Sequence, residues 1–124
     1  MVDTNPNISI ITLKVSGLNE PIKRQILSEW IKKQDTTVCC LQETYFIYKD
    51  TYRLIVNGWR KIYHTNPNQK KVGVAILIAD RPDLKVKKFI RDKEGNYIML
   101  KGSVLQEDTV ILNMYVPNNI ASKY

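Results

Sequence analysis

An acidic side chain stands where a strongly apolar run of the chain ends. Glu43 directly follows "VCCLQ", residues 38–42. In α/β proteins, ligand sites gather at the carboxyl ends of strands. A carboxylate at such a position is costly to bury alone, so we expect a cation beside it. On spacing alone, a Lys or Arg side chain is the commoner partner. The alternative is Mg²⁺, which takes few carboxylates and keeps several waters.

A second group of polar side chains follows another apolar run, near the end of the sequence. Tyr115 and Asn118 lie in "NMYVPNN", residues 113–119. A Tyr hydroxyl at a strand end can donate a hydrogen bond to a phosphate oxygen. A strand-end Tyr that packs its ring and leaves its hydroxyl in water is the more common arrangement. The residues alone leave both interpretations open.

The two cysteines, Cys39 and Cys40, are adjacent in the sequence. Adjacent cysteines rarely bridge each other, because a disulfide needs a wider Cα separation than one peptide unit gives. Together with the single histidine, His64, they make a poor zinc site. We expect both thiols to be small, buried side chains of a strand.

Length and charge narrow the class of protein. The 124 residues suggest one domain or part of one. The net charge of +7 favours polyanions such as nucleic acid or a membrane surface, although solvated surface lysines give the same value. We find no apolar stretch long enough to span a membrane and no signal-peptide pattern. We therefore expect a protein of the nucleus or cytoplasm that is not secreted.

A strand, a helix and a second strand open the chain. Residues 8–15 are rich in β-branched side chains and predict a strand. Residues 20–35 have helical spacing, with Pro21 suited to the first turn and Asn19 to the cap. We expect the helix to lay its apolar positions on a sheet: Ile22, Ile26, Leu27, Trp30 and Ile31. The run 38–42 then completes a βαβ unit.

The rest of the sequence predicts short strands. Asn57-Gly58 between two apolar runs is a strong hairpin signal. Further strands are predicted over residues 71–79, 84–91, 96–104 and 109–116. The pattern favours an α+β fold with mostly antiparallel strands. Residues 38–41 and 74–78 are apolar on both faces, so something besides the single helix must cover their second face.

Taken in order, these segments resemble a known family. The distinctive blocks are "LKVSGLN", "VCCLQET", "GWRKIYH", "GVAILI", "RDKEGNYIMLKG" and "ILNMYVPN". They resemble the endonuclease domain of long interspersed element retrotransposons. This domain belongs to the exonuclease–endonuclease–phosphatase superfamily, with apurinic/apyrimidinic endonucleases and exodeoxyribonuclease III. The resemblance runs from about residue 8 to residue 118.

The resemblance implies half of a four-layer α/β sandwich, in which two sheets pack face to face with helices outside. We expect residues 1–124 to be the N-terminal part of one such domain, with residues 119–124 as a truncated tail. This part would hold one mostly antiparallel sheet and one main helix. The implied partners are the C-terminal half of the domain or a reverse transcriptase portion of the parent protein.

The resemblance also implies a reaction, the Mg²⁺-dependent hydrolysis of DNA phosphodiester bonds, with Mn²⁺ as an alternative ion. Glu43 matches the family's metal ligand. Tyr115 matches the tyrosine that contacts the scissile phosphate, and Asn118 the asparagine of the same block. Gln42, beside the metal ligand, would orient it or touch DNA.

Two departures from the family affect this expectation. Where the family has "N-x-N-G", this sequence has Lys14 and Ser16 at the two Asn positions. Lys14 would either compete with Mg²⁺ for Glu43 or bind phosphate directly. The family's "GDFN" and Ser-Asp-His blocks do not occur in these 124 residues. We therefore expect no cleavage by this chain alone. A non-catalytic retrotransposon fragment or a basic nucleic-acid-binding module is the alternative.

Overall fold

The computed structural model describes residues 8–18, 20–45, 56–59, 61–65, 72–81 and 84–116. The elements in chain order are β1 (Ile10–Lys14), α1 (Pro21–Lys32), β2 (Val38–Gln42), β3 (Lys61–His64), β4 (Val74–Ile78), β5 (Leu84–Arg91), β6 (Tyr97–Val104) and β7 (Glu107–Met114). The predicted tail, residues 119–124, lies outside the described residues. In the described part, no helix has the length and apolar character needed to cross a membrane.

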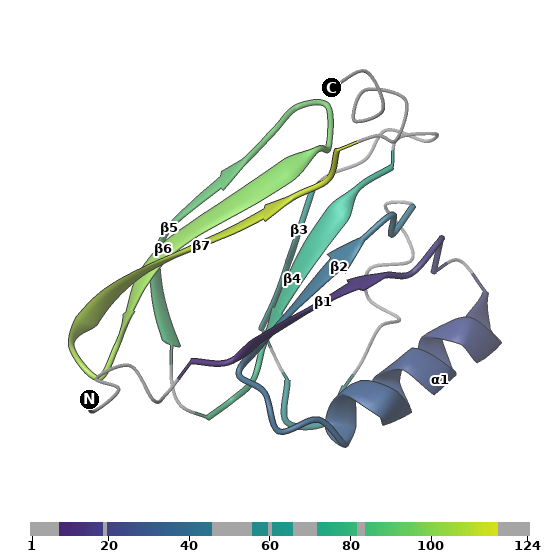
Figure 1. The fold of residues 1–124 in the computed structure, drawn as a ribbon, viewed down its shortest axis with the longest axis horizontal. Helices are drawn as coiled ribbons and strands as arrows, with labels where there is room; N and C mark the ends of the chain where they lie inside the picture. Colours follow the sequence, from purple (N-terminus) through teal and green to yellow (C-terminus); the bar gives the residue numbers. More distant parts are fainter. Residues whose placement is uncertain are drawn as a thin grey trace.

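The elements form three layers. A four-stranded sheet, in the order β1-β2-β4-β3, lies between α1 and a three-stranded sheet, in the order β5-β6-β7 (Figure 1). The predicted fold class, half of an α/β sandwich, is confirmed. The strands divide into two sheets, whereas the sequence predicted one. The division falls between β4 and β5, where the chain bends at Asp80 and Arg81 before it enters the second sheet.

The first three elements form the predicted βαβ unit. β1 and β2 are parallel, with Lys14 opposite Gln42 at their carboxyl ends. Pro21 is the first helical residue, where its missing N–H costs nothing. The N-cap is Glu20, without a side-chain cap, and the predicted cap Asn19 lies outside the described residues.

The face that α1 presents to the sheet differs from the one predicted. Ile31 is fully buried, and Leu27 packs beside it. Three of the predicted contact residues are instead exposed: Ile22, Ile26 and Trp30. Arg24, a charged residue that is not among the predicted contact positions, is buried, and its Nη1 donates to the Leu18 carbonyl at 2.8 Å. That hydrogen bond lets the arginine stem pack beneath the helix.

Alternation along the central strands builds two cores. Cys39 and Leu41 of β2 face α1, whereas Val38 and Cys40 face the second sheet. Both faces of β2 and β4 are therefore covered within this chain. The sequence required a cover besides the helix for the second face, and the inward side chains of β6 and β7 supply it: Ile98, Leu100, Val104 and Ile111.

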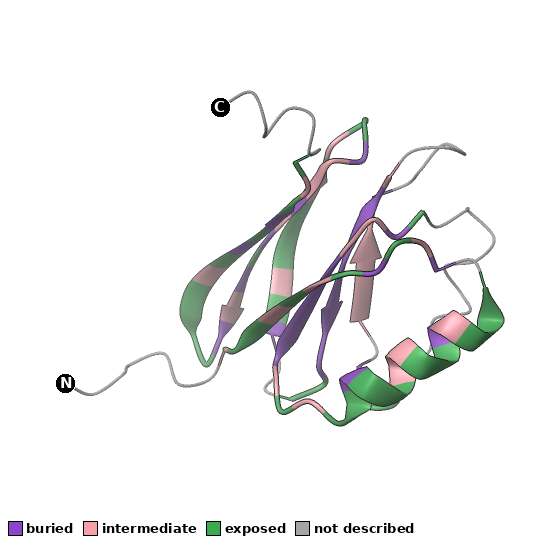
Figure 2. Cartoon of the chain, turned by 45° about the vertical axis from the view of Figure 1, so that its right-hand side comes forward, coloured by how far each residue is buried: buried purple, intermediate pink, exposed green. Residues whose placement is uncertain are grey.

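The open apolar surface lies one layer further out. On the outer face of β7, Val110, Leu112 and Met114 are 59%, 53% and 49% exposed. Figure 2 shows this outer side largely exposed, in contrast to the buried strands of the four-stranded sheet. The uncovered face therefore belongs to the three-stranded sheet, the outermost layer of the described chain.

A glycine permits close contact between β5 and β6. Gly102 lies opposite Val86, next to the bulge between Val86 and Lys88. A Cβ atom at position 102 would overlap the Lys85 carbonyl oxygen. We therefore expect Gly102→Ala to lower the free energy of unfolding by about 1–3 kcal/mol in urea titrations. Ser103→Ala, one residue along the same strand, is the control and should change stability little. Equal stability of the two variants would contradict this packing.

Because the two cysteine thiols are buried, we expect the free energy of unfolding to depend on pH. Burial raises the pKa of Cys39 from 9.0 to about 12, with the Cys40 thiolate adding to the effect. Burial likewise raises the pKa of Cys40 from 9.0 to about 11. The folded protein keeps these protons at pH values where the unfolded chain has lost them. Stability therefore falls as the pH rises above about 9, by about 1 kcal/mol per thiol near pH 10.

Urea unfolding of the wild type and of Cys40→Ala at about pH 8 and about pH 10 checks this expectation. The variant is less stable at both pH values because of the cavity, but it should lose less stability between them. The other ionisable groups are the same in both proteins, so their contributions to the change in stability with pH cancel in the comparison. If the two proteins lost the same stability between these pH values, the burial of the Cys40 thiol would not contribute to the pH dependence.

Candidate functional site

The carboxyl ends of three strands meet at one edge of the structure. Lys14 ends β1 beside Gln42, which ends β2. The Gln42 side chain crosses to the second sheet, where its Nε2 donates to the Met114 carbonyl at 2.8 Å. Met114 ends β7 and directly precedes Tyr115. The edge therefore gathers four of the predicted site residues or their immediate neighbours, from segments far apart in the sequence.

Glu43 has an unusual backbone conformation at this edge. Its φ is 57°, in the left-handed region that costs a non-glycine residue about 1–2 kcal/mol. The neighbouring backbone holds it there on two sides. The Gly17 N–H donates to the Glu43 carbonyl at 2.6 Å, and the Thr44 N–H donates to the Gly73 carbonyl at 3.2 Å. Strain held in this way is typical of functional positions.

The segment on one side of Glu43 depends on a glycine. Gly73 has a φ of +76°, and a Cβ there would lie 2.8 Å from Thr44 Oγ1. The buried Thr44 thus occupies the space that a side chain at position 73 would need. This close approach keeps residues 43–45 in line with the start of β4.

Two basic side chains of α1 hold the segment on the other side. Lys23 Nζ donates to the Ser16 carbonyl at 2.9 Å, and Arg24 Nη1 to the Leu18 carbonyl. The Leu18 N–H in turn donates to the Thr44 carbonyl at 2.9 Å. The helix therefore helps to fix the backbone that carries Glu43.

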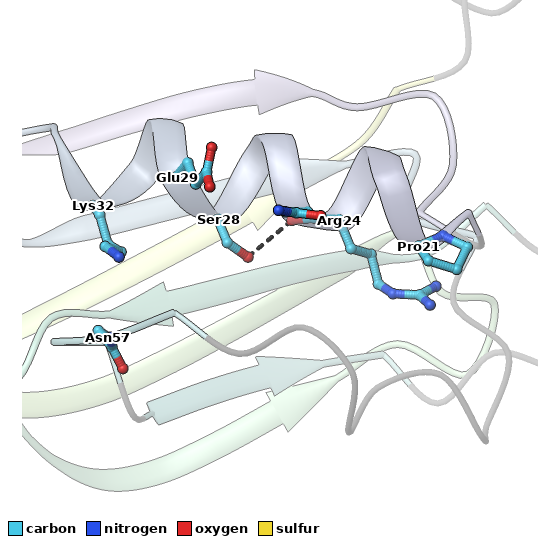
Figure 3. Close-up of a pocket in the computed structure, with 7 residues that line it drawn as sticks. Pro21, Arg24, Ser28, Glu29, Lys32 and Asn57 are labelled. Atoms are coloured by element: carbon cyan, nitrogen blue, oxygen red, sulfur yellow. Dashed lines mark hydrogen bonds between the residues drawn. The ribbon is translucent and has the colours of Figure 1, made fainter.

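Arg24 also lines a groove along α1, with a volume of about 400 Å³ (Figure 3). The groove shares no residue with the strand-end edge. Its described lining is Pro21, Arg24, Gln25, Ser28, Glu29, Lys32 and Asn57. The lining mixes both signs of charge. Its most buried cation already binds a backbone carbonyl, so the groove is not the candidate site.

Lys14 and Glu43 form an ion pair. The Lys14 Nζ lies 2.9 Å from Glu43 Oε2, and the two side chains are 49% and 15% exposed. Oε2 is itself buried and accepts no well-directed hydrogen bond within the described chain. A pair at this distance gains on the order of 5 kcal/mol at an effective dielectric constant of about 20. Because water reaches Lys14, the net gain lies nearer the lower values of exposed pairs, about 1 kcal/mol.

A buried asparagine that the sequence analysis did not select connects the two sheets beside this edge. Asn113 of β7 is 3% exposed. Its Nδ2 donates to the Leu41 carbonyl at 3.0 Å and to the Ala75 carbonyl at 2.8 Å. Its Oδ1 accepts a hydrogen bond from Gln42 Nε2 at 3.3 Å. The signal that was available is its place in the alternation of β7, a polar residue where an apolar one is expected.

The remaining predicted residues are less closely joined to Glu43. Tyr115 is partly buried and packs against the core between the sheets, and its N–H donates to the Asn96 carbonyl at 2.8 Å. Within the described residues, no hydrogen bond links its side chain to Glu43. Asn118 lies outside the described residues. Its proposed role therefore stays a prediction.

Glu43 is the side chain of this edge that could bind a metal ion. The described residues contain no group of three or more His, Cys, Asp or Glu side chains that could enclose a metal ion. A single carboxylate nevertheless suits Mg²⁺, which completes its coordination with waters and substrate phosphates. The buried Oε2 of Glu43, which contacts only an ammonium in the described chain, fits one such ligand.

Comparison with known proteins supports the fold. No protein-family model matches the sequence. The structure is similar to crystal structures of TDP2 from Caenorhabditis elegans, in selenomethionine, native and truncated forms. Each has a TM-score of 0.69, 18% identity and coverage of 90% of this chain. At this identity the likeness concerns the fold alone. The chain spans 35%, 36% and 47% of the lengths of these structures.

Substitution of Asn113 tests the link between the sheets. Asn113→Ala removes the donor of two buried carbonyl groups and should lower the free energy of unfolding by about 2–3 kcal/mol. Asn113→Leu restores apolar volume without a donor and should be destabilised nearly as much. Urea unfolding measures both. If Asn113→Leu matched the wild type, packing rather than hydrogen bonding would explain the position.

Proposed function

We propose that this chain supplies the phosphate-facing edge of a DNA phosphodiester hydrolase that uses Mg²⁺ or Mn²⁺. The observation that carries the proposal is the meeting of β1, β2 and β7 at one edge, with Glu43 held there in a strained backbone conformation. The likeness of the fold to TDP2 supports this class of protein, and the net charge of +7 suits a DNA partner.

Each residue of the edge has a proposed task. Glu43 would hold the divalent ion through its carboxylate. Gln42, whose amide binds the Met114 carbonyl, would keep the β7 end and Tyr115 in register with Glu43. The Tyr115 hydroxyl would donate a hydrogen bond to a phosphate oxygen, and Asn118 would help to position the same phosphate group. When bound, the ion would polarise the phosphate and stabilise the leaving oxygen.

Within this class, we propose a specific relationship to the endonuclease domain of long interspersed element retrotransposons. The sequence blocks "VCCLQET", "GWRKIYH" and "ILNMYVPN" support it. The general base and the histidine of that family lie in blocks that these 124 residues do not contain. Hydrolysis would therefore require them from elsewhere in a parent protein.

A second candidate function is a basic module that binds nucleic acid without cleaving it. The Lys14–Glu43 ion pair favours it, because the carboxylate already has a cationic partner. Both candidate functions place the DNA backbone against the same edge. They differ in whether a divalent ion takes part.

The contact with DNA is testable with a matched pair of tyrosines. Tyr115→Phe removes the hydroxyl proposed to contact phosphate and should weaken binding to a fluorescent duplex about fivefold, the effect of one hydrogen bond. Tyr97→Phe makes the same chemical change on the outer face of the three-stranded sheet and should leave affinity unchanged. Fluorescence anisotropy at low salt measures both.

The wild-type affinity should also fall steeply as salt is raised, because phosphate contacts release counterions. Equal affinities of the two tyrosine variants would place the DNA away from this edge. Binding that does not respond to salt would argue against a backbone contact altogether.

A further inference from the structure

We propose that Lys14 is the resident cation of this edge, so that the chain binds a phosphodiester without a divalent ion and binds divalent ions weakly. The inference rests on the DNA-facing edge of the proposed function and favours its second candidate, the basic module that binds nucleic acid without cleaving it. The sequence left two roles open for Lys14, competitor of the metal and ligand of phosphate. The inference is that the same ammonium fills both roles.

The first step is the position of the ammonium. Lys14 Nζ lies 2.9 Å from Oε2, the buried oxygen of Glu43. A divalent ion bound to that oxygen would lie at about 2.0–2.6 Å from it. The ammonium and the ion would therefore compete for the same carboxylate oxygen. The like charges repel at this separation, so binding of one displaces the other.

The second step is that the ion pair is built into the sheet. Lys14 is the last residue of β1 and is held opposite Gln42 by the parallel ladder. The Val15 N–H donates to the Gln42 carbonyl at 2.9 Å and fixes the next residue. Glu43 is held by the backbone bonds of its own segment. Both partners thus project from fixed backbone, and the pair does not depend on a mobile loop.

The third step is the exposure of the two side chains. Lys14 is 49% exposed, whereas Glu43 is 15% exposed. An ammonium carries three N–H donors. Because half of the Lys14 side chain is exposed, its ammonium remains available to donate to phosphate oxygens. The carboxylate, by contrast, offers its buried oxygen to Lys14 and little surface to solvent.

The two members of the ion pair therefore have different roles. Glu43 anchors the ammonium, and the ammonium supplies the positive charge that a divalent ion would otherwise bring to the phosphate. The ligand class is a phosphodiester backbone, and its binding does not require a divalent ion. Removal of the ammonium should expose Glu43 as a divalent-ion ligand.

The first experiment measures Mn²⁺ binding by the electron paramagnetic resonance signal of the free ion. Lys14→Asn should bind Mn²⁺ at least about tenfold more tightly than the wild type. Lys14→Arg keeps the charge and should bind as weakly as the wild type. The double variant Lys14→Asn/Glu43→Gln should lose the gain. Lys101→Asn, an exposed strand lysine of the outer sheet, controls for net charge and should match the wild type.

The second experiment measures duplex binding by anisotropy in the presence of a chelator. Lys14→Asn should weaken binding about threefold to tenfold more than Lys101→Asn does, and replacing the chelator with Mn²⁺ should recover the affinity of Lys14→Asn only. Circular dichroism melts confirm that the variants fold, which is expected because half of the Lys14 side chain is in solvent.

Two results would overturn the inference in different ways. If the wild type binds Mn²⁺ as tightly as Lys14→Asn, and both lose it with Glu43→Gln, Lys14 does not compete and the divalent site of the proposed function stands. If neither protein binds Mn²⁺ through Glu43, the divalent role of Glu43 fails together with this inference. The Tyr115→Phe comparison still reports separately on the DNA contact.

Discussion

Two central strands that are apolar on both faces impose the architecture of this chain. β2 and β4 are buried along almost their whole length, and an exposed face on either would leave a large apolar surface in water. One helix covers one face, and the inward side chains of the three-stranded sheet cover the other (Figure 1). The layering brings the ends of β1, β2 and β7 to one edge, and every feature of the candidate site follows from it.

Polar contacts then fix that edge at the point where the two sheets meet. The Asn113 amide donates to two carbonyl groups of the four-stranded sheet, and the Gln42 amide donates to a carbonyl group of β7. Buried polar groups of this kind are costly unless fully paired, so they select one register between the layers. Glu43 stands directly beside this network, in a backbone conformation that the segments before α1 and before β4 hold in place. Precision at the edge therefore comes from backbone and amide contacts.

The charge at the edge decides which chemistry the scaffold can perform. A carboxylate at a strand end can bind a divalent ion, but here an ammonium lies beside it at 2.9 Å. The residue at the end of β1 supplies the partner of this carboxylate, because the neighbouring parallel strands β1 and β2 bring their ends together. The fold and the chemistry of the site are therefore separable properties of this chain.

The sequence by itself determined the βαβ start, the strand order along the chain, the burial of Cys39 and Cys40, and the pairing of a cation with Glu43. These follow from local periodicity and from the cost of burying a lone carboxylate. Only the tertiary structure decided the division into two sheets, the burial of Arg24 and the role of Asn113. Each depends on which distant carbonyl or apolar surface a side chain meets. β7 begins at Glu107, two residues before the predicted strand, because the turn is confined to Leu105 and Gln106, both at positive φ, a conformation that neither residue type favours. Long-range packing overrode local preference at Arg24 and Asn113.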